Sequence, residues 1–528
     1  MSELAVPPQV TPTPQPAPKT IAELPGPPGW PLVGNTLSIE RSQFHLQLEA
    51  WQRTYGNMYR ISLGGNTIVV VADPALIAQA LRARPEIFGR TARLARVTAE
   101  AGFNGIFTAN GDDWRRQRPL IMASFDPGHN RKYFPSLVKV TQRFAGRWQR
   151  AVARQEPIDL QGDLMRFTVD VISGLAFGAD INTLEKGDDV IQQHLDQILP
   201  TIFKRVLSPI AYWRHFKLPA DRAVDAHLLA LQQAVNGFIE DARQRLLANP
   251  ALRDAPENMI EAMIVARDKP GSPLTDADVS GNVLTMLLAG EDTTANTLAW
   301  MIYLLHQHPE ALARAQAEVR TALGDDTLPT RLEQLENLDF VEACAHETMR
   351  LKPVAPILPH QAYKDTELGG VAFPAGTLAI FLLRAGAMHE SHFLAPEQFN
   401  PNRWLKTDAN DNIASAESTA AGASSTAGPS APDGSNARPK TPDAISAKRA
   451  AMPFGAGPRM CPGRYLALME IKMAMAMLLG SFEIESVDTP DGAPAREHLA
   501  FTMAPLGLRL RLRLRDGHAM NNSISSIG

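Results

Sequence analysis

The sequence predicts a mainly α-helical protein with a minor β part, folded as a single compact body. Apolar residues recur with a helical period from about residue 74 to residue 350. Within that region, residues 283–305 are apolar on nearly every face, which is typical of a long central helix buried in the core. Short runs of β-branched and aromatic residues bounded by glycine predict small β-sheets.

The N-terminal region is expected to form a tail, a packed segment and a β-hairpin, in that order. Residues 1–24 are polar and proline-rich, which predicts a disordered tail. Residues 25–31 are too rigid for a helix and too apolar for a plain linker, so we expect them to pack against the body. Residues 68–72 predict a strand, and residues 59–63 are its expected hairpin partner across Gly64-Gly65.

The later elements follow the same signals. Pro309 can begin a helix that extends through residue 319. A further helix is predicted over residues 332–351, where Pro353 ends it. Two short strands are expected around residues 370–373 and 377–383.

One domain accounts for the body of the chain. Residues 407–447 have almost nothing to bury, which predicts a flexible insertion. Strong motifs lie on both sides of this insertion, so the domain is expected to continue across it, over residues 25–515. Residues 516–528 are expected to form a disordered tail.

Composition excludes several classes of protein. The 528 residues are 45% hydrophobic and 20% charged, as in ordinary globular proteins. The 52 Lys and Arg residues nearly balance 56 Asp and Glu residues, so we expect no nucleic-acid partner. Two cysteines, Cys344 and Cys461, exclude a disulfide framework and a multi-cysteine zinc or iron–sulfur site.

Neither a targeting signal nor a membrane span is expected. The N-terminal segment lacks the cationic start and the apolar run of a signal peptide. No stretch of about 18 consecutive apolar residues occurs. A cytoplasmic location with reduced thiols is the resulting expectation.

Cys461 lies in the most informative segment, residues 454–463, which read Phe-Gly-Ala-Gly-Pro-Arg-Met-Cys-Pro-Gly. Glycine-rich turns expose backbone N–H groups that stabilise a thiolate, and a predicted helix begins directly after Gly463, where its dipole favours negative charge. Arg459 offers a fixed cation suited to a carboxylate. The alternative is a small apolar residue buried in a loop, as most lone cysteines are.

This segment resembles the Phe-x-x-Gly-x-Arg-x-Cys-x-Gly loop of the cytochrome P450 family at every defining position. The resemblance implies the cytochrome P450 fold and a heme b (iron protoporphyrin IX) cofactor whose iron is ligated by Cys461. It further implies that Phe454 packs beneath the thiolate, that Gly455 and Gly463 belong to the cofactor site, and that Arg459 binds a propionate.

A second motif is Glu347 and Arg350, one turn apart on a predicted helix. The spacing alone does not identify a functional pair, because Glu240 and Arg243 have the same spacing elsewhere in the chain. The order of the following segments resembles the same family, and this implies that Glu347, Arg350 and Arg403 form a buried structural triad beside the heme. Breaking a buried triad of this type costs about 3–5 kcal/mol.

Residues 289–294, Ala-Gly-Glu-Asp-Thr-Thr, place charged side chains in the middle of the apolar helix. Burying a charge there costs free energy, so these residues are expected to have a function. Thr293 can bond a carbonyl one turn back and open local space. A polar kink in a core helix is the alternative. The resemblance assigns Asp292 and Thr293 to proton delivery during O2 activation, and it implies that Ala289 and Gly290 border the oxygen pocket.

Trp114 and Arg118 share one helical face, as they would on an amphipathic surface helix. The resemblance instead places both on a heme propionate. Many relatives carry an arginine seven residues after Pro353 that reaches the other propionate. This chain has His360 there, which is shorter and can be neutral.

The substrate is expected to be a lipophilic small molecule, because the positions that resemble the family's pocket are apolar. The segment from Gly105 to Phe125 looks like that of fatty-acid and alkane hydroxylating branches, so a fatty acid, an alkane or a terpenoid is favoured. Ordinary core is the alternative for each position. The expected pocket residues are Phe103, Ile106, Phe107, Met286, Val354, Ile357, Leu358 and Met503.

The resemblance implies a heme-thiolate monooxygenase that inserts one oxygen atom of O2 by hydroxylation or epoxidation. No flavin, NAD or iron–sulfur module follows Cys461, so a separate ferredoxin or flavodoxin/reductase is the expected electron donor. It would dock on basic residues near the cysteine side, and a solvated basic surface is the alternative. The candidate cations are Arg115, Arg116, Lys448, Arg449, Arg464 and Lys472.

Two other functions stay open. The chain could use peroxide, or rearrange its substrate without external electrons, although Asp292 and Thr293 argue against this. It could also be a heme-dependent sensor or ligand-binding protein without turnover.

Overall fold

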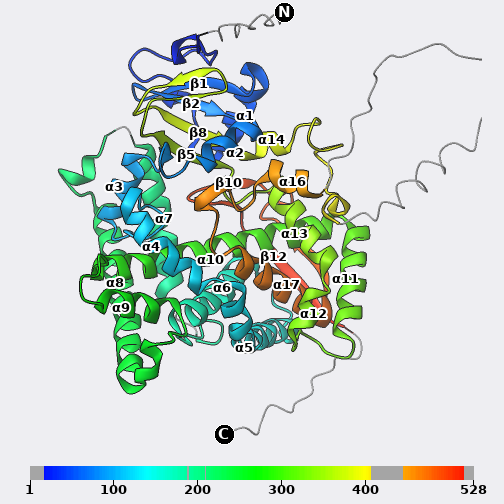
Figure 1. Cartoon of the computed structure of the whole chain (residues 1–528). Helices are drawn as coiled ribbons and strands as arrows, with labels where there is room; N and C mark the ends of the chain where they lie inside the picture. The colour runs from blue at the N-terminus through cyan, green and yellow to red at the C-terminus, as the bar shows by residue number, and fades with distance from the viewer. Residues whose placement is uncertain (1–16, 187–189, 209, 406–443, 516–528) are drawn as a thin grey trace, which may run out of the picture.

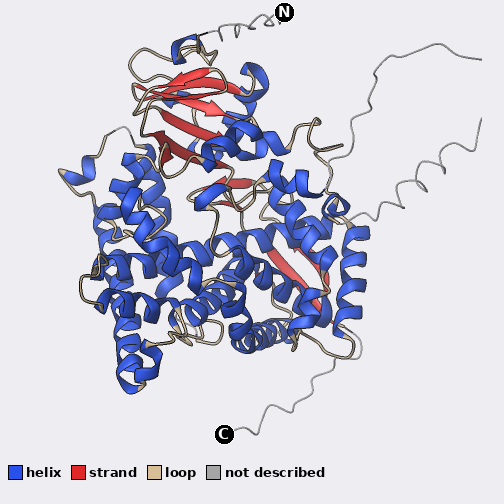
Figure 2. Cartoon of the chain, viewed as in Figure 1, coloured by secondary structure: helices blue, strands red, loops and turns tan. Residues whose placement is uncertain are grey.

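A computed structural model describes residues 17–186, 190–208, 210–405 and 444–515 of the chain. Helices dominate these residues and strands form small sheets, which confirms the predicted fold class (Figure 2). Figure 1 shows the largest sheet with α1, α2 and α14 at one end of the molecule, next to the larger helical part. Within the described ranges, no helix is both long and apolar enough to cross a membrane.

The predicted hairpin is confirmed as β1 (Met58–Leu63) and β2 (Asn66–Val71). Gly64 and Gly65 form its turn with φ of +53° and +83°, values that favour glycine. The strand order in this sheet is β1-β2-β8-β5-β3, with β2 and β8 parallel and the other pairs antiparallel. The sheet is completed by β3 (Phe88–Gly89), β5 (Ile357–Ala362) and β8 (Leu378–Leu382).

Smaller sheets occupy the later part of the chain. β12 pairs with both β4 and β9, while β6–β7 and β10–β11 are antiparallel pairs. β7 and β8 confirm the strands predicted near residues 370–373 and 377–383. The strands are β4 (Ile158–Asp159), β6 (Thr366–Leu368), β7 (Val371–Phe373), β9 (Phe482–Asp488), β10 (Glu497–Leu499), β11 (Met503–Pro505) and β12 (Arg509–Leu514).

The helical part is organised around α10 (Asp276–Gln307), whose 32 residues contain the predicted central helix. Figure 1 shows α10 crossing the helical part. The other helices are α1 (Phe44–Tyr55), α2 (Pro74–Arg82), α3 (Ala92–Glu100), α4 (Gly111–Ser124), α5 (Pro127–Ala153), α6 (Leu160–Phe177), α7 (Val190–Leu207), α8 (Pro219–Ala248), α9 (Met259–Asp268), α11 (Pro309–Leu323), α12 (Leu332–Glu336), α13 (Asp339–Leu351), α14 (Leu383–Ala387), α16 (Ala444–Ala451) and α17 (Arg464–Ser481).

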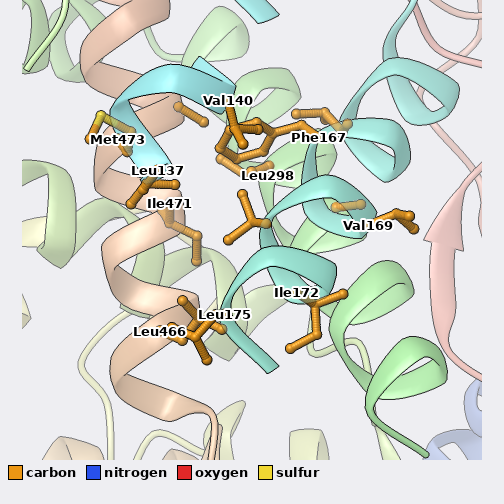
Figure 3. Packing of buried hydrophobic residues seen from close by; sticks show 14 of the residues in the cluster. Leu137, Val140, Phe167, Val169, Ile172, Leu175, Leu298, Leu466, Ile471 and Met473 are labelled. Carbon is orange, nitrogen blue, oxygen red and sulfur yellow. The ribbon is translucent and has the colours of Figure 1, made fainter. Parts of the chain in front are cut away.

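The main core lies where α5, α6, α10 and α17 meet (Figure 3). Phe167 and Leu175 of α6, Leu298 of α10 and Ile471 of α17 are all at most 5% exposed. Close packing of this kind fixes the direction of α10 relative to its neighbours, because the interlocked side chains resist sliding. The core therefore positions the polar segment in the middle of α10.

Residues before the predicted start of the domain already pack on the body. Lys19 forms a β-bridge with Val371, and Leu24 is 7% exposed in the core beside the sheet. Arg60 donates its backbone N–H to the carbonyl of Pro25, so the segment from residue 25 packs on the body as expected. Residues 17–24 are thus part of the structure rather than of a tail.

Some predicted segments cannot be compared with the structure. Residues 1–16 and 516–528, the main parts of the two expected tails, lie outside the described residues. The same holds for residues 407–443 of the expected insertion, whereas residues 444–447 begin α16.

The single helix predicted over residues 332–351 was wrong, because the structure has α12 and α13 there. The break falls at Asn337 and Leu338. Glu318 of α11 accepts the backbone N–H groups of Phe340 and Val341 at 2.7 and 2.9 Å, which satisfies the start of the new helix. A side chain from another helix therefore replaces the local helical bonds.

Gly290→Ala is expected to destabilise the protein by about 1–3 kcal/mol, because a Cβ there would lie 2.7 Å from Cγ1 of buried Ile172. Gly237→Ala is the matched control, since Gly237 also lies inside a helix but has open space around its Cβ position. That control should gain about 0.5–1 kcal/mol. Thermal unfolding followed by circular dichroism measures both changes. Equal midpoints for the two variants would contradict the packing argument.

Candidate functional site

The segment around Cys461 is a tight loop joined to α2 and α17. Cys461 donates its backbone N–H to the carbonyl of Phe454 at 3.0 Å, which closes the loop. Gly457 has a φ of +71°, and a Cβ there would lie 2.5 Å from the carbonyl oxygen of Leu81. Both facts require glycine at residue 457. Gly455 has a φ of +72° with open space around it, so its backbone conformation alone favours glycine.

Opposing effects act on the pKa of the Cys461 thiol. Burial raises the pKa of Cys461, and this is the largest effect. A hydrogen bond from the Gly463 backbone N–H and the charges of Arg118 and Arg464 lower it. α17 begins at Arg464, so the sulfur lies just before a helix N-terminus, as predicted. A metal cation bound at the sulfur would lower the pKa of Cys461 further and stabilise the thiolate.

Trp114 and Arg118 lie on one face of α4, beside the cysteine loop. The Arg118 guanidinium is 5.9 Å from the centroid of the Trp114 ring, and that of Arg459 is 5.5 Å from it. Arg118 also donates to the carbonyl of Met460. Arg459 donates to Ile106 and thereby joins the loop to the segment before α4.

Two further arginines, Arg84 and Arg90, belong to this site, and the sequence analysis missed both. Arg90 donates to the carbonyl of Phe107 at 3.0 Å and lies 4.2 Å from the centroid of its ring. Arg84 donates to the carbonyl of Ala456, inside the cysteine loop, at 2.9 Å. Arg84, Arg90, Arg118 and Arg459 together form what we call the arginine cluster.

The arginine cluster has positive charge but no carboxylate partner. Among the residues that the structure describes, none of its four members forms an ion pair. Burial, followed by mutual repulsion, lowers the pKa of Arg84, Arg90 and Arg459 to about 9. Buried cations need an anion. The two propionates of a heme would supply two carboxylates, and the neighbouring thiol would supply the iron ligand, so the residues present fit heme.

His360 takes a different role from the arginine of many relatives. It is 1% exposed, and burial followed by the charges of Arg90 and Arg84 lowers its pKa well below the ordinary value. The ring is therefore neutral. It lies between the carbonyl of Leu358 and the guanidinium of Arg84. His360 cannot supply the cation that the family pattern has at this position.

The middle of α10 faces an open space. Ala289 is exposed although the preceding eight residues are buried. Thr293 donates its hydroxyl to the carbonyl of Ala289 at 2.8 Å, the contact that the sequence predicts. The Cβ position of Gly290 lies against Ile172 of α6. That glycine therefore makes room for the neighbouring helix, whereas Ala289 borders the open space.

Asp292 is held by two hydrogen bonds. Asn296, one turn later, donates to Oδ1 at 2.6 Å, and Thr502 donates its hydroxyl to Oδ2. Burial raises the pKa of Asp292, and these two bonds partly oppose the shift. The net effect raises the pKa of the Asp292 carboxyl group above that of an ordinary aspartate.

The segment Phe501–Met503 joins three parts of the site, and only Met503 was predicted. Phe501 lies 5.8 Å from Phe107 between ring centroids. Thr502 contacts Asp292, and the backbone N–H of Met503 donates to the carbonyl of Val354 at 2.8 Å. The loop before α4, the middle of α10 and the segment after α13 therefore converge here.

The expected pocket residues divide into two groups. Phe107 and Val354 are partly exposed and contact this junction, and Leu358 is partly exposed on β5, so all three side chains can contact a ligand. The others are at most 9% exposed and pack into the hydrophobic core, as the alternative interpretation held. These buried residues are Phe103, Ile106, Met286, Ile357 and Met503.

The structure brings Glu347, Arg350 and Arg403 together. Nε and Nη2 of Arg350 donate to the two Glu347 oxygens at 2.8 Å each, and Nε of Arg403 donates at 3.1 Å. Trp404 and the Asn400 backbone also donate to Glu347, at 2.8 and 2.9 Å. Both Glu347 and Arg350 have fully buried side chains. The second half of α13 is thereby fixed to the segment 400–404.

Several of the expected basic docking residues are less available than predicted, whereas Arg449 is exposed and stays a candidate. Arg115 and Arg116 each form ion pairs with two carboxylates. The Lys472 side chain is 12% exposed and bonded to a carboxylate of α13 at 2.7 Å. The Lys448 side chain lies outside the described residues. Arg464 is partly exposed beside the cysteine loop and stays a candidate.

Comparison with known proteins agrees with this geometry. The family model described as Cytochrome P450 matches residues 24–512. The chain is 25% identical to pentalenene oxygenase of Streptomyces avermitilis, covering 92% of this chain and 96% of that protein. It is 26% identical to cyclooctat-9-en-7-ol 5-monooxygenase of Streptomyces melanosporofaciens, covering 87% and 88%. The crystal structure of the cytochrome P450DA heme domain aligns with a TM-score of 0.75, covering 94% of this chain and 98% of that one at 23% identity.

Glu347→Gln is expected to destabilise the protein by about 3–5 kcal/mol, because it leaves two buried guanidinium groups without their carboxylate. Glu240→Gln is the matched control, since Glu240 also precedes an arginine by three residues but is exposed on α8. That control should stay within about 0.5 kcal/mol of the unmodified protein. Denaturant titration of the two variants measures the difference. A Glu347→Gln variant as stable as the control would refute the structural role of the triad.

Proposed function

Because the chain belongs to the cytochrome P450 family, we propose that it inserts one oxygen atom of O2 into a lipophilic small molecule. The reaction is a hydroxylation or an epoxidation, with electrons from a separate ferredoxin or flavodoxin/reductase. The observation that carries this proposal is the partly buried Cys461 thiol beside a cluster of arginines that form no ion pair with a carboxylate among the described residues. A cytoplasmic location stays a prediction from the sequence.

The cofactor of the family is heme, which supplies the activation of O2 when bound. In this proposal Cys461 is the iron ligand, and the Gly463 N–H and α17 stabilise its negative charge. Trp114, Arg118 and Arg459 would hold the propionates. Phe454 and Gly463 shape the two sides of the cysteine loop.

Asp292 and Thr293 would deliver protons into the open space beside α10. Burial holds the pKa of Asp292 above its ordinary value, which favours the protonated form and suits a group that donates a proton. The Thr293 hydroxyl donates to the carbonyl of Ala289, which leaves its oxygen lone pairs available to accept a hydrogen bond. Thr502 sets the orientation of the Asp292 carboxyl group.

A fatty acid, an alkane or a terpenoid is the proposed substrate class. Phe107, Phe501, Val354 and Leu358 are partly exposed apolar side chains, which supports a lipophilic ligand. Two relatives are named for the oxidation of pentalenene and of cyclooctat-9-en-7-ol, which supports the terpenoid choice.

The purified protein, a surrogate ferredoxin with its reductase, NADPH and ¹⁸O₂ test the proposal with a panel of terpenes, alkanes and fatty acids. The expected product carries one ¹⁸O atom and forms only with the complete electron-transfer mixture. Peroxide alone in place of the mixture is the control. Turnover with peroxide only would favour the peroxide-using alternative, and ligand binding without any turnover would favour a sensor.

Asp292→Asn is expected to lower kcat by about 100-fold or more and to abolish the pH dependence that this carboxyl group causes. Thr502→Val removes a hydrogen bond that lowers the pKa of Asp292. In that variant the corresponding limb of the kcat–pH profile should move to higher pH. A pH profile unchanged in both variants would show that Asp292 has no part in proton delivery.

A further inference from the structure

Arg84 lies just after α2, where the family pattern of the sequence provides no role for it. Its side chain reaches from the end of α2 to the cysteine loop and to β5. The residue is only 5% exposed, so its guanidinium cannot be solvated as a surface arginine would be. Burial of an arginine without a purpose is rare, because removing the charge from water is costly.

Three neutral acceptors fix the Arg84 guanidinium. Nε donates to the carbonyl of Leu81 at 3.1 Å, and Nη2 donates to the carbonyl of Ala456 at 2.9 Å. Nη1 lies 3.3 Å from Nε2 of His360. A guanidinium has five N–H bonds, so these contacts use three and leave two. The group is thus held in one orientation with donors to spare.

His360 is built to accept from Arg84. Its Nδ1 lies 3.0 Å from the carbonyl of Leu358, and a carbonyl can only accept, so Nδ1 carries the hydrogen. Nε2 of the neutral ring is then an acceptor facing the guanidinium. The ring also packs against Phe381 at 4.8 Å between centroids, which fixes its plane. His360 therefore orients Arg84 without neutralising it.

The charge of Arg84 is uncompensated within the described residues. It forms no ion pair there, and the nearest charged neighbours include the cations Arg118 and Arg459. Both of those arginines belong to the side of the site where a heme propionate is expected. An anion at this point would relieve the repulsion among all three.

We propose that Arg84 binds a propionate carboxylate of the heme and that His360 is the positioning residue that aims it. The cation that relatives carry at position 360 is supplied here by Arg84, and position 360 provides an acceptor instead. The inference rests on heme binding at the cysteine loop, but not on the substrate or the electron donor.

The rate of heme transfer from the intact holoprotein to excess apomyoglobin tests this inference without any measurement of activity. Arg84→Leu should lose heme about 10- to 100-fold faster than the unmodified protein, the range for one buried charge-assisted contact. Arg82→Leu is the matched control, since Arg82 is the exposed last residue of α2. Its heme loss should be unchanged.

A second arm separates a propionate contact from a general loss of structure. Protein reconstituted with heme whose propionates are methyl esters offers no carboxylate to Arg84. With this heme, Arg84→Leu and the unmodified protein should lose the cofactor at rates within about twofold of each other. The double variant Arg84→Leu/His360→Arg returns a cation to position 360, so it should recover most of the retention of ordinary heme.

Each outcome decides the matter. Faster loss of ordinary heme by Arg84→Leu, absent with the esterified heme, supports the proposal. Equal loss by Arg84→Leu and Arg82→Leu overturns it, as does an Arg84→Leu defect of the same size with both hemes. An unmodified protein that binds no heme would instead overturn the proposed function, so the two failures are distinguishable.

Discussion

The structure depends on a concentration of buried and partly buried positive charge around one thiol. Arg84, Arg90, Arg118 and Arg459 converge on the cysteine loop from separate parts of the chain, and repulsion among them opposes this arrangement. Their backbone carbonyl partners orient them but cannot neutralise them. A dianionic cofactor removes the repulsion, so its binding and the folding of this region stabilise each other. The protein without heme is therefore expected to be loosest at this point.

The helical part serves the site by fixing α10. Core packing against α6 fixes that helix, while Glu347 fixes the second half of α13 to residues 400–404. Because these contacts hold α10 in place, the fold does not depend on further packing of its polar segment, which faces an open space. Thr502 adds a restraint from the β10–β11 loop, so the orientation of Asp292 responds to a segment that also carries Phe501.

Local sequence patterns predicted the features that are local in the chain. The cysteine loop, the start of α17, the hairpin at Gly64-Gly65 and the apolar α10 depend on neighbouring residues, and each was predicted. Arg84 meets His360 across 276 positions, and Asp292 meets Thr502 across 210, and no periodicity reports such pairs. The break between α12 and α13 was missed for the same reason, because Glu318, which accepts the first N–H groups of α13, lies on another helix. The residues proposed to carry the chemistry could therefore be predicted from the sequence, whereas Arg84 and Thr502, which contact them from distant parts of the chain, could not.

The most direct test of the central claim uses the two cysteines of the chain. The difference spectrum of the dithionite-reduced protein with carbon monoxide should show the strongly red-shifted band of a heme thiolate. Cys344→Ser, which changes the buried cysteine of α13, should keep the band, and Cys461→Ser should lose it while still holding heme. A band that persists in Cys461→Ser, or that disappears in Cys344→Ser alone, would contradict the assignment of Cys461 as the iron ligand.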